Sequence, residues 1–417
     1  MTRVGLIPGR FDASIASPPD LAFTREEYAA RATTICSLMR QAGVDLLWLT
    51  TPDAIAWLHG LSLMWYKANS PMRYPQCYGT AVHAASGHFI HFDNPTELPA
   101  LADMSVSNDN RWLPDREAAP NLEFIMDELG KEGWLGGTVG LEFWSYVPNR
   151  AISTMFEGAF LSHGCAVVDS SAIARRARQR KSPQEIGYIE RAMEICDIGH
   201  RAIVELLKPG ITELELFGAV NARMMAAGGE FPALIPPFRS LRLVDGEPIV
   251  GGHRAASRKE IRRGELLGAD LCGVYHRYHA NAKRSYYVGD NPPPQLIDRY
   301  VLSGGSFDLI EREFHAGMTV KQVNSRLRQY YEETGLWTDK AGWALGYELG
   351  LSLPPDWVGD FYFNVGDDLY LDRVFEPCMV TNFESVFGTG LIDTVVWEAD
   401  RARVLSTLPR ELIVVPG

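Results

Sequence analysis

One pattern occurs twice in this sequence, as Gly210-Ile211-Thr212-Glu213-Leu214-Glu215-Leu216 and as Gly317-Met318-Thr319-Val320-Lys321-Gln322-Val323. In each copy a glycine turn precedes a threonine that, with a glutamate or glutamine three residues later, can cap the start of a helix. Gly228 and Gly335 stop the two helices at matching positions. Because β-rich sequence follows both copies, we predict a duplication into two related α+β halves with a cleft between them. Chance similarity between two ordinary helices is the alternative.

Residues 23–169 are predicted to form an α/β domain, preceded by an irregular arm at residues 1–22. Thr24 and Glu27 have the spacing of a capping box at the start of the first helix. The second domain is residues 170–417, which contains the repeat. Apolar runs and turn residues predict strands of the first domain at Leu46–Leu49, Val139–Phe143 and Ala166–Val168, and a hairpin at Tyr78–His83 and His88–Phe92.

A basic stretch, Arg175–Lys181, joins the two predicted domains. An anionic partner could bind it. A solvated connector is the favoured interpretation, because Ser182-Pro183-Gln184-Glu185 follows directly and carries the cap, the first-turn proline and the capping carboxylate of a strong helix start.

The composition is that of a soluble globular protein. The chain has 417 residues, of which 46% are hydrophobic and 22% charged, enough for two domains with cores of their own. The net charge of −12 argues against nucleic acid or anionic membranes as partners. The first residues, 1–9, contain no long apolar stretch of the kind that signal peptides have, and no apolar run reaches the length of a membrane span. The cysteines form no CxxC pair, which argues against a structural zinc site and for a reduced, cytoplasmic location.

Polar side chains that could take part in catalysis or binding are concentrated in three segments of the second domain. The segments are Asp270–Ser285, Gly346–Trp357 and Thr381–Val395, and His253 precedes the first of them. Glu384 lies in an apolar run, where a carboxylate is costly unless it is paired, so a functional or network role is favoured.

These segments resemble the five ligand-bearing segments of the creatinase/aminopeptidase P, or pita-bread, superfamily. Its metal-dependent members carry Asp, Asp, His, Glu and Glu there. The matching positions here are Asp270, Asn281, Tyr347, Glu384 and Ile392. Only two of the five are carboxylates, and a pair of divalent ions needs bridging and terminal ligands on each metal. We therefore expect the pita-bread fold with no metal and no other cofactor.

Two metal-free branches of the superfamily, the creatinases and the ectoine hydrolases, are more similar. Gly251, His253, Gly264 and Glu384 resemble the creatinase pattern. The segment Gly346–Trp357, with its Pro-Pro-Asp-Trp end, is similar to ectoine hydrolases, where the position of Asp270 is a glutamate. The same family pattern also matches Gly273, Arg277-Tyr278-His279 and Arg284.

The resemblance implies a metal-independent hydrolase that opens an amide, amidine or cyclic amidine C–N bond of a small molecule, in a homodimer. A metal-dependent Xaa-Pro peptidase-like enzyme, with Asp270, His279 and Glu384 as a mononuclear set, and a non-catalytic binding protein are the alternatives. The predicted catalytic residues are His253, Asp270, His279 and Glu384, and the predicted substrate-binding residues are Tyr347, Trp65, Tyr66, Arg73 and Arg284.

Each of these residues also has a structural interpretation. Asp270 could form a salt bridge with Arg284, and His253 and His279 could be satisfied core histidines. Tyr347 could fill the space of the missing ligand, and the residues of the first domain could belong to a packed loop.

Overall fold

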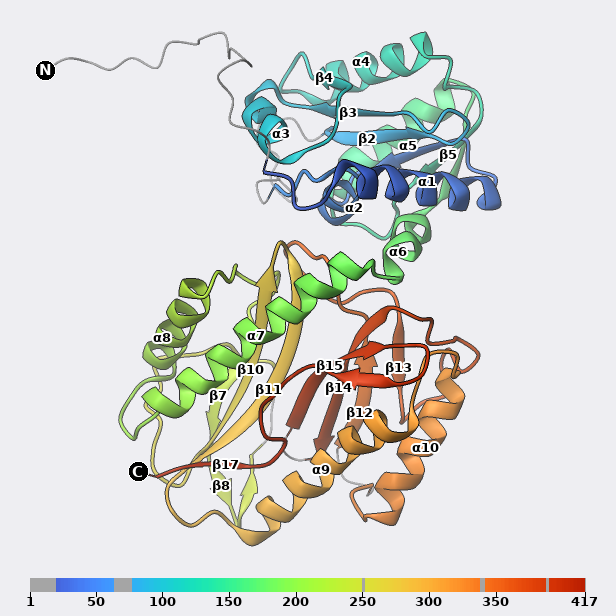
Figure 1. The fold of residues 1–417 in the computed structure, drawn as a ribbon. Coiled ribbons are helices and arrows are strands. Elements are labelled where there is room, and N and C mark those ends of the chain that lie inside the picture. The colour runs from blue at the N-terminus through green and yellow to red at the C-terminus, as the bar shows by residue number, and fades with distance from the viewer. Residues whose placement is uncertain (1–19, 64–76, 250–251, 338–341, 388–389, 417) are drawn as a thin grey trace, which may run out of the picture. The chain divides into compact units, whose positions relative to one another are not determined.

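A computed structural model describes residues 20–63, 77–249, 252–337, 342–387 and 390–416. The chain divides into two compact units between Ala177 and Arg178 (Figure 1). No helix of the described residues is long and apolar enough to cross a membrane.

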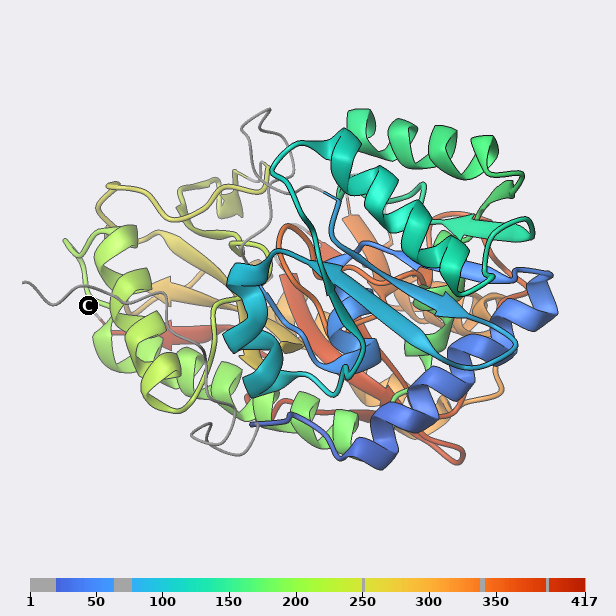
Figure 2. The same ribbon diagram turned by 90° about the horizontal axis from the view of Figure 1, so that it is seen from above.

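The N-terminal unit is an α/β domain built on one sheet of six strands. The strand order is β4 (Asn110–Trp112), β3 (Phe89–Asp93), β2 (Gly79–His83), β1 (Leu46–Leu49), β5 (Thr138–Leu141) and β6 (Ala166–Asp169). α1 (Arg25–Ala42) and α2 (Pro52–His59) lie on one side of this sheet, and α4 (Ala118–Lys131) and α5 (Arg150–Ser162) lie on the other (Figures 1 and 2). In the described part of this unit there are also the short helices η2 (Pro95–Glu97) and α3 (Leu98–Met104), and α6 (Ser171–Gln179), which ends just past the boundary between the units.

The apolar runs in the sequence decide this arrangement. All four residues of β1 are buried, and Trp48 packs against Phe92 and Phe156 with ring centroids 5.7 and 5.0 Å apart. The predicted strands and the hairpin are confirmed with shifts of one or two residues at their ends. Thr24 caps α1 as predicted, since its Oγ1 accepts a hydrogen bond from the Glu27 N–H at 3.2 Å.

The basic stretch is not a solvated connector throughout. Its first residues belong to α6, and Lys181 at its end is buried. The ammonium of Lys181 donates to Glu348 Oε1 at 2.5 Å and to the Gln179 carbonyl at 3.1 Å. A buried carboxylate opposite the lysine, which no local pattern reveals, is the reason for this difference.

The C-terminal unit confirms the predicted duplication. One half has α7 (Pro183–Leu206), α8 (Glu213–Ala226) and the hairpin of β10 (Leu266–Tyr275) and β11 (Tyr278–Val288). The other half has α9 (Pro294–Glu313), α10 (Val320–Glu333) and the hairpin of β14 (Met379–Phe387) and β15 (Gly390–Trp397). The capping boxes of Thr212 and Thr319 are both present, and Gly210 and Gly317 have φ of 90° and 95°.

One sheet runs through both halves in the order β13-β12-β14-β15-β11-β10-β7. Its outer strands are β13 (Tyr362–Asn364), β12 (Gly342–Tyr347) and β7 (Phe238–Leu241), and β16 (Ala402–Val404) and β17 (Ile413–Val415) pair with β15 and β11. A separate small sheet contains β8 (Leu243–Val244) and β9 (Glu247–Pro248).

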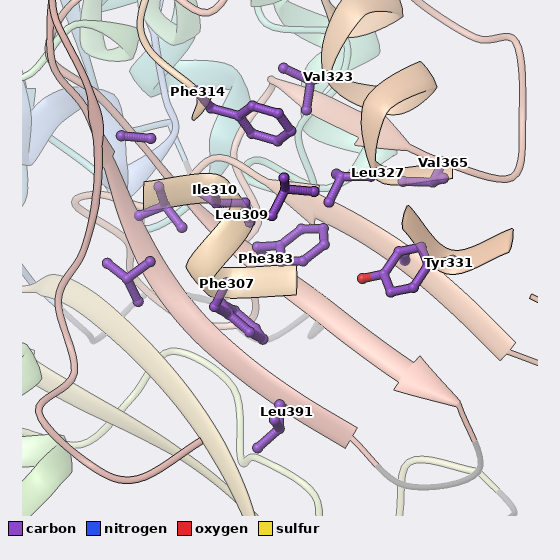
Figure 3. Packing of buried hydrophobic residues seen from close by; sticks show 14 of the residues in the cluster. Phe307, Leu309, Ile310, Phe314, Val323, Leu327, Tyr331, Val365, Phe383 and Leu391 are labelled. Carbon is purple, nitrogen blue, oxygen red and sulfur yellow. The ribbon is translucent and has the colours of Figure 1, made fainter. Parts of the chain in front are cut away.

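The long helices cover one face of this sheet. α7 packs on β10 and β11, and α9 packs on β14 and β15 (Figure 1). In the second half, Phe307 of α9 meets Phe383 of β14 with ring centroids 5.2 Å apart (Figure 3). Burying a side chain of this size contributes about 2–3 kcal/mol. Because side chains alternate along a strand, the neighbours of Phe383, Asn382 and Glu384, point to the opposite face. We call this opposite side of the sheet the open face.

Candidate active site

The strand register aligns the two predicted acids on the open face. Asp270 of β10 lies opposite Lys283 of β11, Lys283 lies opposite Ile392 of β15, and Ile392 lies opposite Glu384 of β14. Residues directly opposite each other share one face of a sheet. Asp270, Lys283, Ile392 and Glu384 therefore form one row across four strands, which we call the acid row.

A second row of polar residues runs beside it. Asn281 lies opposite Cys272, and Asn382 lies opposite Thr394. Thr394 Oγ1 joins the two hairpins, since it accepts from the Asn281 N–H at 2.9 Å and donates to the Asn281 carbonyl at 3.0 Å. Tyr347 extends this row, because its N–H donates to Asn382 Oδ1 at 2.8 Å. All five positions of the superfamily's ligand set thus lie within these two rows or, in the case of Tyr347, are hydrogen-bonded to them.

Asp270 has a partly buried carboxyl group that accepts a hydrogen bond from the side chain of Asn281. Asn281 Nδ2 donates to its Oδ1 at 2.6 Å and to the Leu271 carbonyl at 3.0 Å. The pKa of Asp270 is raised to about 7, mainly by burial and also by the negative charge of Glu384, while Lys283 and the Asn281 hydrogen bond oppose the shift. A carboxyl with this pKa can both accept and donate a proton near neutral pH.

Glu384 is held by a donor on each of its oxygens. Trp343 Nε1 donates to Oε2 at 3.2 Å, and Asn382 Nδ2 donates to Oε1 at 3.1 Å. Burial raises the pKa of Glu384, and Trp343, Lys283, Asn382 and then His253 oppose the rise. His253 is exposed in the segment before β10 and lies within electrostatic reach of Glu384.

Tyr347 is placed as a hydrogen-bond donor. Its hydroxyl oxygen accepts from Trp357 Nε1 at 3.3 Å, which leaves the hydroxyl proton for another acceptor. Burial raises the pKa of Tyr347 well above 10, and the charges of Glu384 and Asp270 add to this shift. The phenol therefore stays protonated at neutral pH.

His279 has both ring nitrogens bonded to backbone. The Ala233 N–H donates to Nε2 at 3.0 Å, and Nδ1 lies 2.8 Å from the Arg277 carbonyl, to which it donates. Burial lowers the pKa of His279 to about 3, with a further contribution from the charge of Arg277. This is the arrangement of a neutral histidine that fixes the 230–233 segment.

Arg284 lies on the helix-covered side, away from Asp270. Its Nη2 donates to Asp393 Oδ2 at 3.0 Å, its Nη1 to the Ile392 carbonyl at 3.0 Å and its Nε to the Pro409 carbonyl at 2.8 Å. Its partner is thus Asp393 and not Asp270, and both side chains are fully buried. Trp65, Tyr66 and Arg73 lie outside the described residues.

Lys283 is a member of the acid row that the sequence analysis did not single out. The signal was present in the alternation of β11, because Lys283 follows Asn281 by two residues and therefore shares its face. A lysine on a strand that is otherwise buried along its length is unusual enough to mark a site.

The side chains of the open face do not fit a pair of metal ions. The described residues contain no group of three or more His, Cys, Asp or Glu side chains that could hold one. The carboxylate oxygens that would ligate a metal instead accept N–H donors: Asp270 from Asn281, and Glu384 from Trp343 and Asn382. The ring nitrogens of His279 are already bonded, which removes the third ligand of a mononuclear set.

A duplicated α+β unit whose open sheet face carries the functional positions defines the pita-bread class of hydrolases. Residues 187–400 match the family described as Metallopeptidase family M24, and the chain belongs to this family.

Curated relatives span most of the chain. Ectoine hydrolase of Halomonas elongata is 26% identical over 421 residues, covering 94% of this chain and 98% of that protein. Xaa-Pro dipeptidase of Pyrococcus furiosus is 28% identical over 239 residues, covering 56% of this chain and 64% of that protein. The family and these relatives support hydrolase activity.

Solved structures of the same class share the fold. The prolidase of Pyrococcus horikoshii superposes with a TM-score of 0.72 at 20% identity, covering 92% of this chain and all of that one. A His350Ala variant of Escherichia coli aminopeptidase P gives a TM-score of 0.70 at 16% identity, over 92% and 95% of the two chains.

Proposed function

We propose that this protein is a metal-independent hydrolase of a C–N bond in a small non-peptide molecule, an amide, amidine or cyclic amidine related to ectoine or creatine. The observation that supports the proposal is the bonding of the acid row, where Asp270 and Glu384 accept hydrogen bonds from N–H donors. The similarity to ectoine hydrolase over nearly the full length of both proteins supports the same reaction class.

Asp270 is suited to act first as a general base and then as a general acid. As a carboxylate it takes a proton from water while the water oxygen attacks the carbon of the C–N bond. As a carboxylic acid it then gives this proton to the leaving nitrogen, the C–N bond breaks, and the elements of water are divided between the two products. A pKa of about 7 suits both transfers. A positioned acid–base group of this kind contributes roughly 10²–10⁴-fold to the rate.

Three other side chains assist this reaction. The Tyr347 hydroxyl can donate to the oxygen on which negative charge develops, because its own oxygen is already bonded to Trp357. Glu384 can accept an N–H of the substrate and hold the nitrogen toward Asp270. His253, exposed and within reach of the charge of Glu384, can exchange protons with solvent.

An Xaa-Pro peptidase is the second candidate, favoured by the dipeptidase relative and the family to which the chain belongs. The experiment that separates the two uses the full chain after exhaustive chelation, and again with added Mn²⁺. Ectoine, creatine, their acyclic analogues and Xaa-Pro dipeptides are incubated with each sample, and products are measured by mass spectrometry. We expect hydrolysis of a non-peptide compound at the same rate in both samples. Hydrolysis of a dipeptide that requires Mn²⁺ would overturn the proposal.

A further inference from the structure

Lys283 carries a positive charge on the open face that no described side chain neutralises directly. Its charge lowers the pKa of both Asp270 and Glu384, so the ammonium lies within electrostatic reach of both acids. Within the described ranges, however, no carboxylate lies within 4.0 Å of its Nζ, and it donates no hydrogen bond. A partly buried cation in this situation is costly unless a bound anion pairs with it.

Gly390 makes room for this ammonium. A Cβ at Gly390 would lie 3.0 Å from Lys283 Nζ and 3.3 Å from its Cε. Gly390 precedes Ile392 by two residues on β15 and shares its face. The side chain of Lys283 therefore leaves the acid row and runs over Gly390, which places the ammonium beside the two acids and not between them.

We propose that Lys283 binds a carboxylate of the substrate, so that the substrate is a small zwitterion with a carboxylate at one end and the reacting C–N group at the other. This inference rests on the proposed function, which places the C–N group at Asp270. The charges fix the orientation of the substrate. Its nitrogen-rich end faces Asp270 and Glu384, and its anionic end, which these acids repel, faces the ammonium over Gly390.

The test compares matched ligands that differ only in this charge. Ectoine and creatine serve as probes, each beside its uncharged primary carboxamide. Binding to the full chain is measured by calorimetry at neutral pH for the native protein and for Lys283→Met, which keeps the length of the side chain and removes the ammonium. We expect the native protein to bind at least one carboxylate probe roughly 10- to 100-fold more tightly than its carboxamide, as a charge-assisted hydrogen bond allows. In Lys283→Met this preference should disappear.

Two further variants control for folding and for net charge. Lys208→Met removes an equally charged side chain at an exposed position after α7 and should keep the full preference. Gly390→Ala should weaken binding of the carboxylate probe while the carboxamide is affected less, because the added methyl group crowds the ammonium. Melting temperatures of all variants show whether each is folded.

The outcomes separate this inference from the proposed function. Equal binding of carboxylate and carboxamide, an equal loss of both in Lys283→Met, or no binding of any probe would overturn the role of Lys283. A carboxylate preference that depends on Lys283, without hydrolysis of any non-peptide compound, would uphold this binding site and overturn the proposed function. Hydrolysis of both forms with equal KM would uphold the function and overturn the inference.

Discussion

The side-chain amide of Asn281 donates a hydrogen bond to Asp270 Oδ1 across 2.6 Å. In the metal-dependent members that the sequence resembles, both positions are aspartates, and two carboxylates so close together are held by metal ions. Here Asn281 offers Asp270 an N–H where those members carry a second carboxylate. The remaining amide oxygen, Asn281 Oδ1, is buried and has no hydrogen-bond partner in the described part of the chain. The replacement of a single side chain therefore changes both the charge and the bonding of the site.

Restoring the missing carboxylates should restore metal binding. In the double variant Asn281→Asp with Ile392→Glu, carboxylates would occupy four of the five ligand positions, beside Asp270 and Glu384. We expect this variant to bind Mn²⁺ and to gain thermal stability from it, since a ligand that binds only the folded state at 100 times its Kd stabilises by about 2.7 kcal/mol. The native protein should retain less than one equivalent of metal. Elemental analysis and melting curves with and without Mn²⁺ measure both. Two tightly held ions in the native protein would contradict the metal-free interpretation.

The fold was predictable because its signals are local. The capping residues Thr212 and Thr319 and their glycine turns are read from a few neighbouring residues, and the structure confirms them. The partners of charged side chains were not predictable in this way. Lys181 pairs with Glu348, and Arg284 pairs with Asp393. Both partners are far apart along the chain, so no local sequence pattern predicts these pairs.

The site was predictable in part for the same reason. The resemblance identified the positions of Asp270 and Glu384, and the register of the sheet brings them into one row. It could not show that the backbone of Ala233 bonds to His279, because this contact depends on the course of a loop. Lys283 was one of several polar residues in the segment Asp270–Ser285, and only the strand register shows that it shares a row with Asp270 and Glu384.

The acid limb of the pH–rate profile should move in opposite directions in two variants. If Asp270 acts first as a base, activity falls as pH drops through its pKa of about 7. Lys283 lowers this pKa and Glu384 raises it. In Lys283→Met the limb should therefore move to higher pH, and in Glu384→Gln the residual activity should show a limb at lower pH. Profiles of kcat/KM between pH 5 and 9 measure both, and shifts of the same sign would contradict the assignment.

Arg284 should matter for stability and not for substrate binding. Arg284→Met leaves the carboxylate of Asp393 buried beside Arg410 but without its closest cation. Removing one partner of a buried pair costs about 3–5 kcal/mol, so we expect a large fall in the free energy of unfolding by urea denaturation. The fraction that remains folded should keep its KM. A raised KM in a protein of unchanged stability would place Arg284 at the substrate after all.

Histidine substitutions should separate the two predicted catalytic histidines. His279→Phe removes the acceptor of the Ala233 N–H and the donor to the Arg277 carbonyl, so its main effect should be a stability loss of about 1–3 kcal/mol for the unsatisfied groups. His253→Ala, at an exposed position, should leave the melting temperature unchanged and lower kcat. An unchanged kcat in His253→Ala would show that His253 takes no part in proton transfer.

The two acids of the acid row should be needed for turnover and not for folding. Asp270→Asn and Glu384→Gln keep the shape of each side chain and remove its basicity, so each should lose most activity, roughly 10²-fold or more. The native pKa of Asp270 is raised from its ordinary value of 3.8 to about 7. Its protonated form is thus favoured by folding, and this contribution to stability is present below about pH 4 and lost as the pH rises through 7.

Asp270→Asn should therefore be more stable than the native protein at pH 8, by on the order of 1–3 kcal/mol because the carboxyl is only partly buried, and the difference should shrink toward pH 5. A structural salt bridge predicts the reverse, a stability loss of about 3–5 kcal/mol with activity retained in the folded fraction. Asp270→Glu is the matched control, since it restores the longer acid found in ectoine hydrolases, and it should keep part of the activity. Denaturation at the two pH values and kcat of the folded protein measure these outcomes together. Full activity in Asp270→Asn would show that the acid row is a structural network and that the chemistry lies elsewhere.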